Sequence, residues 1–200
     1  MKSYPSLVRA KDAKKFTAHL FEKLDGQNFR VEFSTKKGWY KFGSRNQLID
    51  ENHQDFGIAV KLFNEKYGDL LTAVLKKNNY KEGVIFGELW GPRSLGGMHH
   101  PEDELDLTFF DFSPKGGIIA PAIFRKMFEG QVPTPKFLGI RNWGPALIED
   151  VYNGAYGDGE GVVGKENSAI CYMAKAKTKT WLEAISSRYG EEFRKKFGDE

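Results

Sequence analysis

The sequence has little cysteine and no long apolar run, and both absences narrow the class of protein. Cys171 is the single cysteine among 200 residues, so no disulfide forms within the chain. No segment approaches the roughly 18 consecutive apolar residues that a membrane-spanning helix needs, and residues 1–20 mix charges where a signal peptide would be apolar. The sequence therefore predicts no membrane partner and a cytoplasmic protein, in the host cytoplasm if the chain is phage-encoded.

A strong excess of one charge and internal repetition are also lacking. The chain has 30 Lys and Arg residues against 27 Asp and Glu, a net charge of +3, which is compatible with binding a polyanion but does not establish it. What is present is an ordinary hydrophobic share of 40%, including 16 Phe residues, which is enough for one core. We expect one domain over residues 1–200, because a second full domain would be cramped.

Alternating polar and apolar residues predict strands. Residues 28–33 alternate in this way, a turn follows at Lys36-Lys37-Gly38, and residues 39–42 continue the pattern, which predicts a β-hairpin. Further predicted strands cover residues 84–90, 106–112, 161–165 and 169–175.

Helical spacing of apolar residues predicts one long or two consecutive helices over residues 54–77. Further predicted helices cover residues 121–128, 142–152 and 181–197, and residues 11–22 fit either a short helix or an extended segment. Strands and helices follow one another without a repeating βαβ order. The predicted class is therefore α+β, with antiparallel sheets flanked by helices.

One short string, Glu22-Lys23-Leu24-Asp25-Gly26, contains a Lys-x-Asp-Gly pattern that means little alone. Five further strings follow it in order: Lys41-Phe42-Gly43-Ser44-Arg45, Phe86-Gly87-Glu88-Leu89, Phe109-Phe110-Asp111, Glu160-Gly161-Val162-Val163 and Lys175-Ala176-Lys177-Thr178. This order resembles the covalent nucleotidyltransferase superfamily of DNA ligases, RNA ligases and mRNA capping enzymes, over roughly residues 20 to 181. With Asn28 it is most similar to the RNA ligase 2 branch. The resemblance implies a nucleotidyltransferase domain of the ATP-grasp-like ligase type.

The resemblance implies that Lys23 is the nucleophile that becomes joined to AMP. Its amine is protonated at an ordinary pKa of about 10.4, and nearby positive charge from Lys175, Lys177 and a Mg²⁺ or Mn²⁺ ion would favour the neutral form. Alternation places both of these lysines on one face of a strand. Lys179 continues the alternation, so the pair is either Lys175 and Lys177 or Lys177 and Lys179. A solvated edge strand is the alternative for this run.

The carboxylates take separate roles by resemblance. Glu88 contacts the ribose of ATP, with a structural ion pair to Arg45 as the alternative. Glu160 helps to place the divalent metal. Asp25 is expected to be needed after the lysine has been adenylylated, and Glu22 adjoins the nucleotide.

The remaining expected contacts involve neutral or basic side chains. Phe110 would stack on adenine, with core packing as the alternative. Arg45 and Asn28 would contact phosphate. Lys165 is either a further phosphate contact or a surface lysine.

The resemblance implies an ATP-dependent RNA ligase that joins 5′-phosphate and 3′-hydroxyl ends through lysyl-AMP. About twenty residues follow Lys177, too few for an OB-fold or other C-terminal domain. We therefore expect a nucleotidyltransferase domain alone, which acts on RNA ends, or on DNA or hybrid ends, with a protein partner in place of the missing domain. The alternatives are a DNA nick-sealing ligase and a non-catalytic nucleic-acid-binding protein of the same fold.

Overall fold

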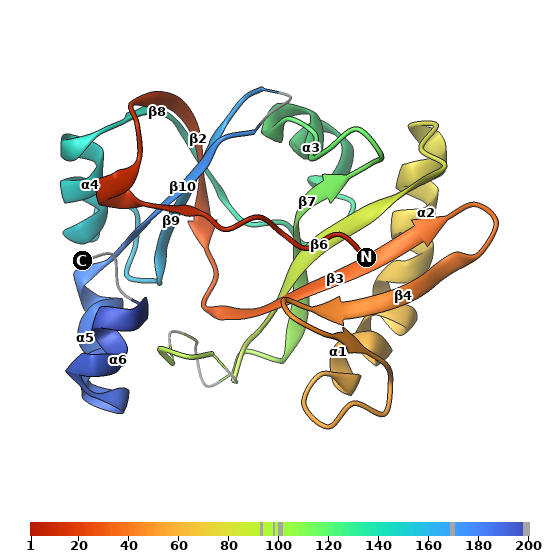
Figure 1. The fold of residues 1–200 in the computed structure, drawn as a ribbon, viewed down its shortest axis with the longest axis horizontal. Helices are drawn as coiled ribbons and strands as arrows, with labels where there is room; N and C mark the ends of the chain where they lie inside the picture. The colour runs from red at the N-terminus through yellow and green to blue at the C-terminus, as the bar shows by residue number, and fades with distance from the viewer. Residues whose placement is uncertain (93, 98, 100–101, 169–170, 198–200) are drawn as a thin grey trace. The chain divides into compact units, whose positions relative to one another are not determined.

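The computed structural model describes residues 1–92, 94–97, 99, 102–168 and 171–197 (Figure 1). The chain forms two compact units. The first unit comprises Met1–Pro5, Gln27–Trp90 and Leu105–Thr134, and the second comprises Ser6–Gly26, Gly91–Glu104 and Pro135–Glu200. Each unit is built around one five-stranded sheet. Among the described residues, every helix is too short or too polar to cross a bilayer.

The sheet of the first unit contains the predicted hairpin. Its strands lie in the order β5 (Leu48–Ile49), β4 (Gly38–Ser44), β3 (Gly26–Ser34), β6 (Glu82–Trp90) and β7 (Asp106–Ser113). β3 and β4 pair antiparallel, as do β6 and β7. Gly38 follows the hairpin turn with a φ of +67°, a backbone conformation that favours glycine. The hairpin and the predicted strands at 84–90 and 106–112 are confirmed.

Helices cover one face of this sheet, as Figure 1 shows for α1 and α2 beside β3 and β4. The predicted helical region over residues 54–77 is a continuous run of α1 (Gly57–Leu62), a π-helical segment (Phe63–Tyr67) and α2 (Gly68–Lys77). The predicted helix at 121–128 is confirmed as α3 (Pro121–Phe128). The core between sheet and helices is rich in phenylalanine and includes Phe29, Phe33, Phe63, Phe109, Phe112 and Phe128.

The sheet of the second unit is antiparallel apart from its first pair. Its strands lie in the order β1 (Val8–Arg9), β10 (Met173–Lys177), β9 (Gly161–Glu166), β2 (Phe16–Lys23) and β8 (Phe137–Trp143). β1 pairs parallel to β10. A short 3₁₀ turn (Ala10–Asp12) follows β1, so most of the region 11–22 is extended and the helical alternative is wrong.

Three boundaries in this unit differ from the sequence prediction. The helix predicted at 142–152 begins later, as α4 (Pro145–Tyr152), because Asn142 and Trp143 end the unpredicted strand β8. The strand predicted at 169–175 runs as β10 from Met173 to Lys177; residues 169–170 lie outside the described part. The single helix predicted at 181–197 is two helices, α5 (Lys179–Tyr189) and α6 (Glu191–Phe197), separated at Gly190, whose φ is +84°.

Alternation divides the side chains of this second sheet between two faces. Ala18 and Leu20 of β2, Val162 of β9, and Ala174 and Ala176 of β10 are buried in one core with residues of α4. Side chains of the intervening positions point to the opposite face. That face therefore receives Lys23, Lys175 and Lys177.

Candidate active site

Lys23 is the last residue of β2, on the sheet face opposite the α4 core. It lies across from Gly161 of β9, so Glu160 comes beside it just before β9 begins. The Lys23 Nζ is 2.7 Å from Oε2 of Glu160. The Glu160 residue is 6% exposed, which is unusual for a carboxylate without a charged partner.

A glycine holds Glu160 in this place. Gly161 has a φ of +147°, and a Cβ added to it would lie 2.0 Å from the carbonyl oxygen of Ala176 in β10. Only glycine allows β9 and β10 to approach so closely at this end of the ladder. The close approach brings the side chain that precedes β9 near the side chain that ends β10.

That second side chain is Lys177. Its Nζ is 3.3 Å from Oε1 of Glu160, so one carboxylate bridges two ammonium groups. The Lys177 side chain is 4% exposed and that of Lys23 is 18% exposed. Two cations share one anion in a largely desolvated place, which leaves a net positive charge. This Lys23–Glu160–Lys177 cluster is suited to an anionic ligand such as phosphate.

The other lysines of the predicted motif differ in their position. Lys175 lies two residues before Lys177 on the same strand face, and it pairs with Val163 of β9. Lys179 is the first residue of α5, and its Nζ lies 3.7 Å from Glu183 on an exposed helix surface. The strand alternation therefore ends at Lys177, which favours the pair Lys175 and Lys177.

Lys165 is 3% exposed, and its Nζ lies 5.1 Å from the ring centroid of Phe21. The surface-lysine alternative for this residue is wrong. It belongs to the same sheet face as Lys23, because β9 positions 163 and 165 alternate away from the core residue Val162.

Asp25 has a partner that the sequence did not indicate. Its Oδ1 accepts the backbone N–H of Leu95 at 3.1 Å, and its Oδ2 accepts the N–H of Gly96 at 2.6 Å. The Asp25 residue is 8% exposed. The carboxylate therefore holds a loop some seventy residues away against the turn that follows Lys23. Glu22, by contrast, is exposed, and its backbone N–H donates to the carbonyl of Lys136.

The first unit holds the other predicted residues, and three of them share a sheet face. Asn28 of β3, Glu88 of β6 and Phe110 of β7 each adjoin a core residue along the strand, so they point away from the helices. Arg45 is exposed in the turn after β4. Phe110 is absent from the phenylalanine-rich core, so its core-packing alternative is wrong.

The N-terminal segment crosses this same face. The ring of Tyr4 lies 4.9 Å from that of Phe110 in an edge-on arrangement and 5.1 Å from that of Phe86. The Tyr4 hydroxyl donates to Oδ2 of Asp111 at 2.5 Å. Arg30 donates to the carbonyl of Lys2 at 3.0 Å. Sequence reasoning missed Tyr4, because no pattern links a terminal residue to a strand about one hundred positions later.

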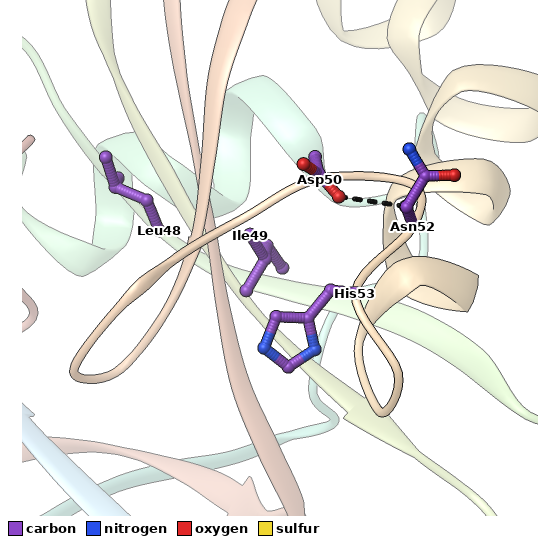
Figure 2. Close-up of a pocket in the computed structure, with 5 residues that line it drawn as sticks. All are labelled: Leu48, Ile49, Asp50, Asn52 and His53. Carbon is purple, nitrogen blue, oxygen red and sulfur yellow. Dashed lines mark hydrogen bonds between the residues drawn. The ribbon is translucent and has the colours of Figure 1, made fainter.

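A separate hollow of about 400 Å³ lies in the first unit, lined by Leu48, Ile49, Asp50, Asn52 and His53 (Figure 2). Its polar groups are used by the turn itself. Oδ1 of Asp50 accepts the N–H of Asn52 at 2.9 Å, and Nδ1 of His53 accepts the N–H groups of Asp55 and Phe56, each at 3.3 Å. These bonds shape the entry to α1, and the hollow contains none of the predicted site residues.

The described residues contain no group of three or more His, Cys, Asp or Glu side chains placed to hold a metal ion. A metal at Glu160 would therefore not find a set of three protein ligands among these residues. Mg²⁺ is commonly held by one or two carboxylates together with phosphate oxygens and water. Glu160 fits a metal that enters with a nucleotide, rather than one held by protein ligands alone.

Comparisons with known proteins identify a matching family and a shared fold. The model of the RNA ligase family matches residues 18–182. An RNA ligase of Naegleria gruberi solved with pyrophosphate is 16% identical, with a TM-score of 0.67 over 86% of this chain and 52% of its own. A variant of a Naegleria gruberi RNA ligase with ATP and manganese is 16% identical, with a TM-score of 0.71 over 93% of this chain and 59% of its own.

An archaeal ATP-dependent RNA ligase is 15% identical, with a TM-score of 0.66 over 91% of this chain and 50% of its own. At these identities the structures establish a shared fold. This chain spans between half and three fifths of their length. The search of curated protein sequences found no match.

Proposed function

The chain belongs to the RNA ligase family, and from that premise we propose that it is an ATP-dependent RNA ligase whose Lys23 carries AMP. The observation that supports this most is the Lys23–Glu160–Lys177 cluster, in which residues from three strand ends meet with Nζ to carboxylate distances of 2.7 and 3.3 Å. A nucleophile, a carboxylate and a second cation in one buried place are what nucleotidyl transfer to a lysine requires.

In the first step, Nζ of Lys23 attacks the α-phosphorus of ATP. A phosphorus–nitrogen bond forms, the bond to the β-phosphate oxygen breaks, and pyrophosphate leaves. The amine must lose a proton, and Oε2 of Glu160 already contacts that nitrogen as an acceptor. Lys177 and Lys175 hold the phosphate oxygens and offset the charge that develops on pyrophosphate.

Glu160 is also the carboxylate that would hold a divalent metal. Related RNA ligases have been solved with ATP or AMP and manganese. A bound Mg²⁺ or Mn²⁺ would neutralise phosphate charge and favour the neutral amine of Lys23. Because the Glu160 carboxylate contacts Lys23 and Lys177, a metal bound to it would also release the Lys23 amine and the Lys177 ammonium group toward the phosphates.

The remaining nucleotide contacts in this proposal are those that the resemblance implies. Glu88 takes the ribose, Phe110 stacks on adenine, and Asn28 and Arg45 contact phosphate. The shared face of Asn28, Glu88 and Phe110 supports this assignment. The ring of Tyr4 lies beside that of Phe110 on this face, with 4.9 Å between the ring centroids, so the surroundings of Phe110 are aromatic.

Later steps use the same AMP. An oxygen of a 5′-phosphate end displaces Lys23 from the AMP phosphorus, and a 3′-hydroxyl then displaces AMP to join the strands. The family assignment supports RNA ends as substrates. We further propose that residues 1–200 act as one nucleotidyltransferase module in the cytoplasm, where ATP is available, and that a protein partner helps to capture RNA, DNA or hybrid ends.

The test is covalent labelling with ATP that carries radioactive phosphorus at the α position, in the presence of magnesium. We expect label on the protein that survives denaturation and is lost in Lys23→Ala. The Lys179→Ala variant should retain the label, because Lys179 lies on an exposed helix surface. Folded wild-type protein that takes up no label would overturn the proposal. Nicked RNA, DNA and hybrid duplexes added afterwards identify which ends are joined.

A further inference from the structure

We propose that Trp181 is a positioning residue for Lys177, and that the face of its indole ring keeps the Lys177 ammonium group beside Glu160. This inference deepens the proposed function and rests on it. Nζ of Lys177 lies 3.7 Å from the centroid of the Trp181 ring and 3.3 Å from Oε1 of Glu160. A tryptophan face attracts a cation more strongly than other aromatic rings, and the attraction grows when water is excluded.

Lys177 needs such a support. A lysine side chain has a flexible four-carbon stem and a strongly hydrated ammonium group, so it samples several conformations unless contacts restrain it. Its carboxylate partner is shared with Lys23, which is the closer of the two at 2.7 Å against 3.3 Å. When Glu160 turns to another ligand, the contact with the ring still restrains Lys177.

The ring itself is fixed relative to Glu160. Trp181 lies in the first turn of α5, where its backbone N–H donates to Oγ1 of Thr178 at 3.1 Å. The Thr178 hydroxyl donates to the carbonyl of Gly159 at 2.6 Å, and the Thr178 N–H donates to the carbonyl of Glu160 at 3.1 Å. One helix-capping threonine therefore joins the backbone at Gly159 and Glu160 to the helix that presents the ring.

Packing fixes the other edge of the indole. Trp181 is 1% exposed and lies in a small core with Leu182 and Ile185. Its Nε1 has no hydrogen-bond partner among the described residues. A Cβ added to Gly96 would lie 2.5 Å from that nitrogen and 2.9 Å from Oδ2 of Asp25. The ring is thus held by close contact with the loop that Asp25 anchors, and its face is what remains for Lys177.

The expected effect is on the rate of AMP transfer more than on ATP binding. Lys177 acts as charge develops on the departing pyrophosphate, so a misplaced ammonium group lowers the rate at saturating ATP. Trp181→Leu should slow lysyl-AMP formation by about tenfold, the size that a desolvated cation–π contact supports. The KM for ATP should change less than the rate. Trp181→Phe, which restores an aromatic face, should recover most of the rate.

The matched control is Leu182→Ala, because Leu182 is buried in the same small core as Trp181. Thermal unfolding measures the stability that each variant loses. The inference is supported if Leu182→Ala loses comparable stability and keeps the wild-type rate. It is overturned if Leu182→Ala and Trp181→Leu slow the reaction equally, or if Trp181→Phe is as slow as Trp181→Leu.

A second readout does not depend on activity. Subtracting the fluorescence of Trp181→Phe from that of the wild type isolates the emission of Trp181. Removing the cation with Lys177→Met should shift that emission, whereas Lys179→Met should not. Equal spectra in Lys177→Met and the wild type would overturn the contact itself. If the wild-type protein forms no lysyl-AMP while Lys177→Met still shifts the Trp181 emission, the proposed function is overturned and the contact is supported.

Discussion

At the scale of single residues, Glu160 differs from the other predicted carboxylates because two lysines depend on it. Its oxygens contact Nζ of Lys23 and Nζ of Lys177, and the residue is 6% exposed. A substitution there removes the negative charge that holds two buried cations together, so its effect exceeds that of losing one surface ion pair.

Glu160→Gln keeps the shape of the side chain and removes its charge. We expect lysyl-AMP formation to slow by about a hundredfold, because the acceptor of the Lys23 proton and the charge that positions Lys177 are both lost. Single-turnover labelling with ATP measures this rate. The control is Glu183→Gln, since Glu183 pairs only with the exposed Lys179. A Glu160→Gln protein that labels at the wild-type rate would contradict the assignment.

Asp25→Asn tests the loop contact. In wild-type Asp25 each carboxylate oxygen accepts one backbone N–H, from Leu95 or from Gly96. The asparagine amide has one oxygen and one NH₂ group, and the NH₂ group cannot accept, so one of the two bonds is lost. We expect about 1–3 kcal/mol of lost stability, the usual cost of a buried unsatisfied group. Thermal unfolding measures the loss, and amide exchange at Gly96 should accelerate. Asp158→Asn, on an exposed loop, should change neither.

The sequence indicates which residues to expect in the candidate site, but it does not indicate their contacts. The order of short strings indicates Lys23, Glu160 and Lys177, because residue type and spacing are visible in a linear chain. The bond from Asp25 to Gly96 and the contact between Lys177 and Trp181 depend on how distant segments meet. No periodicity records either contact, so the structure was needed to find them.

At the scale of elements, predictions were right where one physical signal dominated. The β3–β4 hairpin follows from alternation around a Lys-Lys-Gly turn, and α3 follows from Pro121 at its first position with helical apolar spacing. β8 was missed because it shows no clear alternation of buried and exposed residues. The break between α5 and α6 depends on one glycine, Gly190, whose left-handed conformation a charge pattern does not reveal.

The junction of β9 and β10 supplies an element-scale prediction. Gly161→Ala forces a Cβ to within 2.0 Å of the Ala176 carbonyl in a backbone conformation that alanine rarely adopts. We expect a loss of more than about 2 kcal/mol of stability and a strong loss of labelling, because Glu160 moves with the strand end. Gly159→Ala is the matched control, since a Cβ there meets open space. Equal behaviour of the two variants would show that the close approach does not position Glu160.

At the scale of the whole molecule, the predicted residues divide between the two compact units. The second unit holds the lysines with Glu160 and Asp25, and the first holds Asn28, Arg45, Glu88 and Phe110. The α+β class and the antiparallel sheets were predicted correctly, and the family match covers residues 18–182 of both units. The division into two units was not predicted, because length and composition alone favoured one core.

The central claim is that AMP becomes attached to Lys23, and peptide mapping tests it most directly. The wild-type protein is incubated with ATP and magnesium, digested, and analysed by tandem mass spectrometry without exposure to acid, which cleaves phosphorus–nitrogen bonds. We predict the added mass of AMP on the peptide that contains Lys23 and on no other lysine. AMP on Lys165, Lys175 or Lys177 instead, or its persistence in Lys23→Ala, would contradict the account.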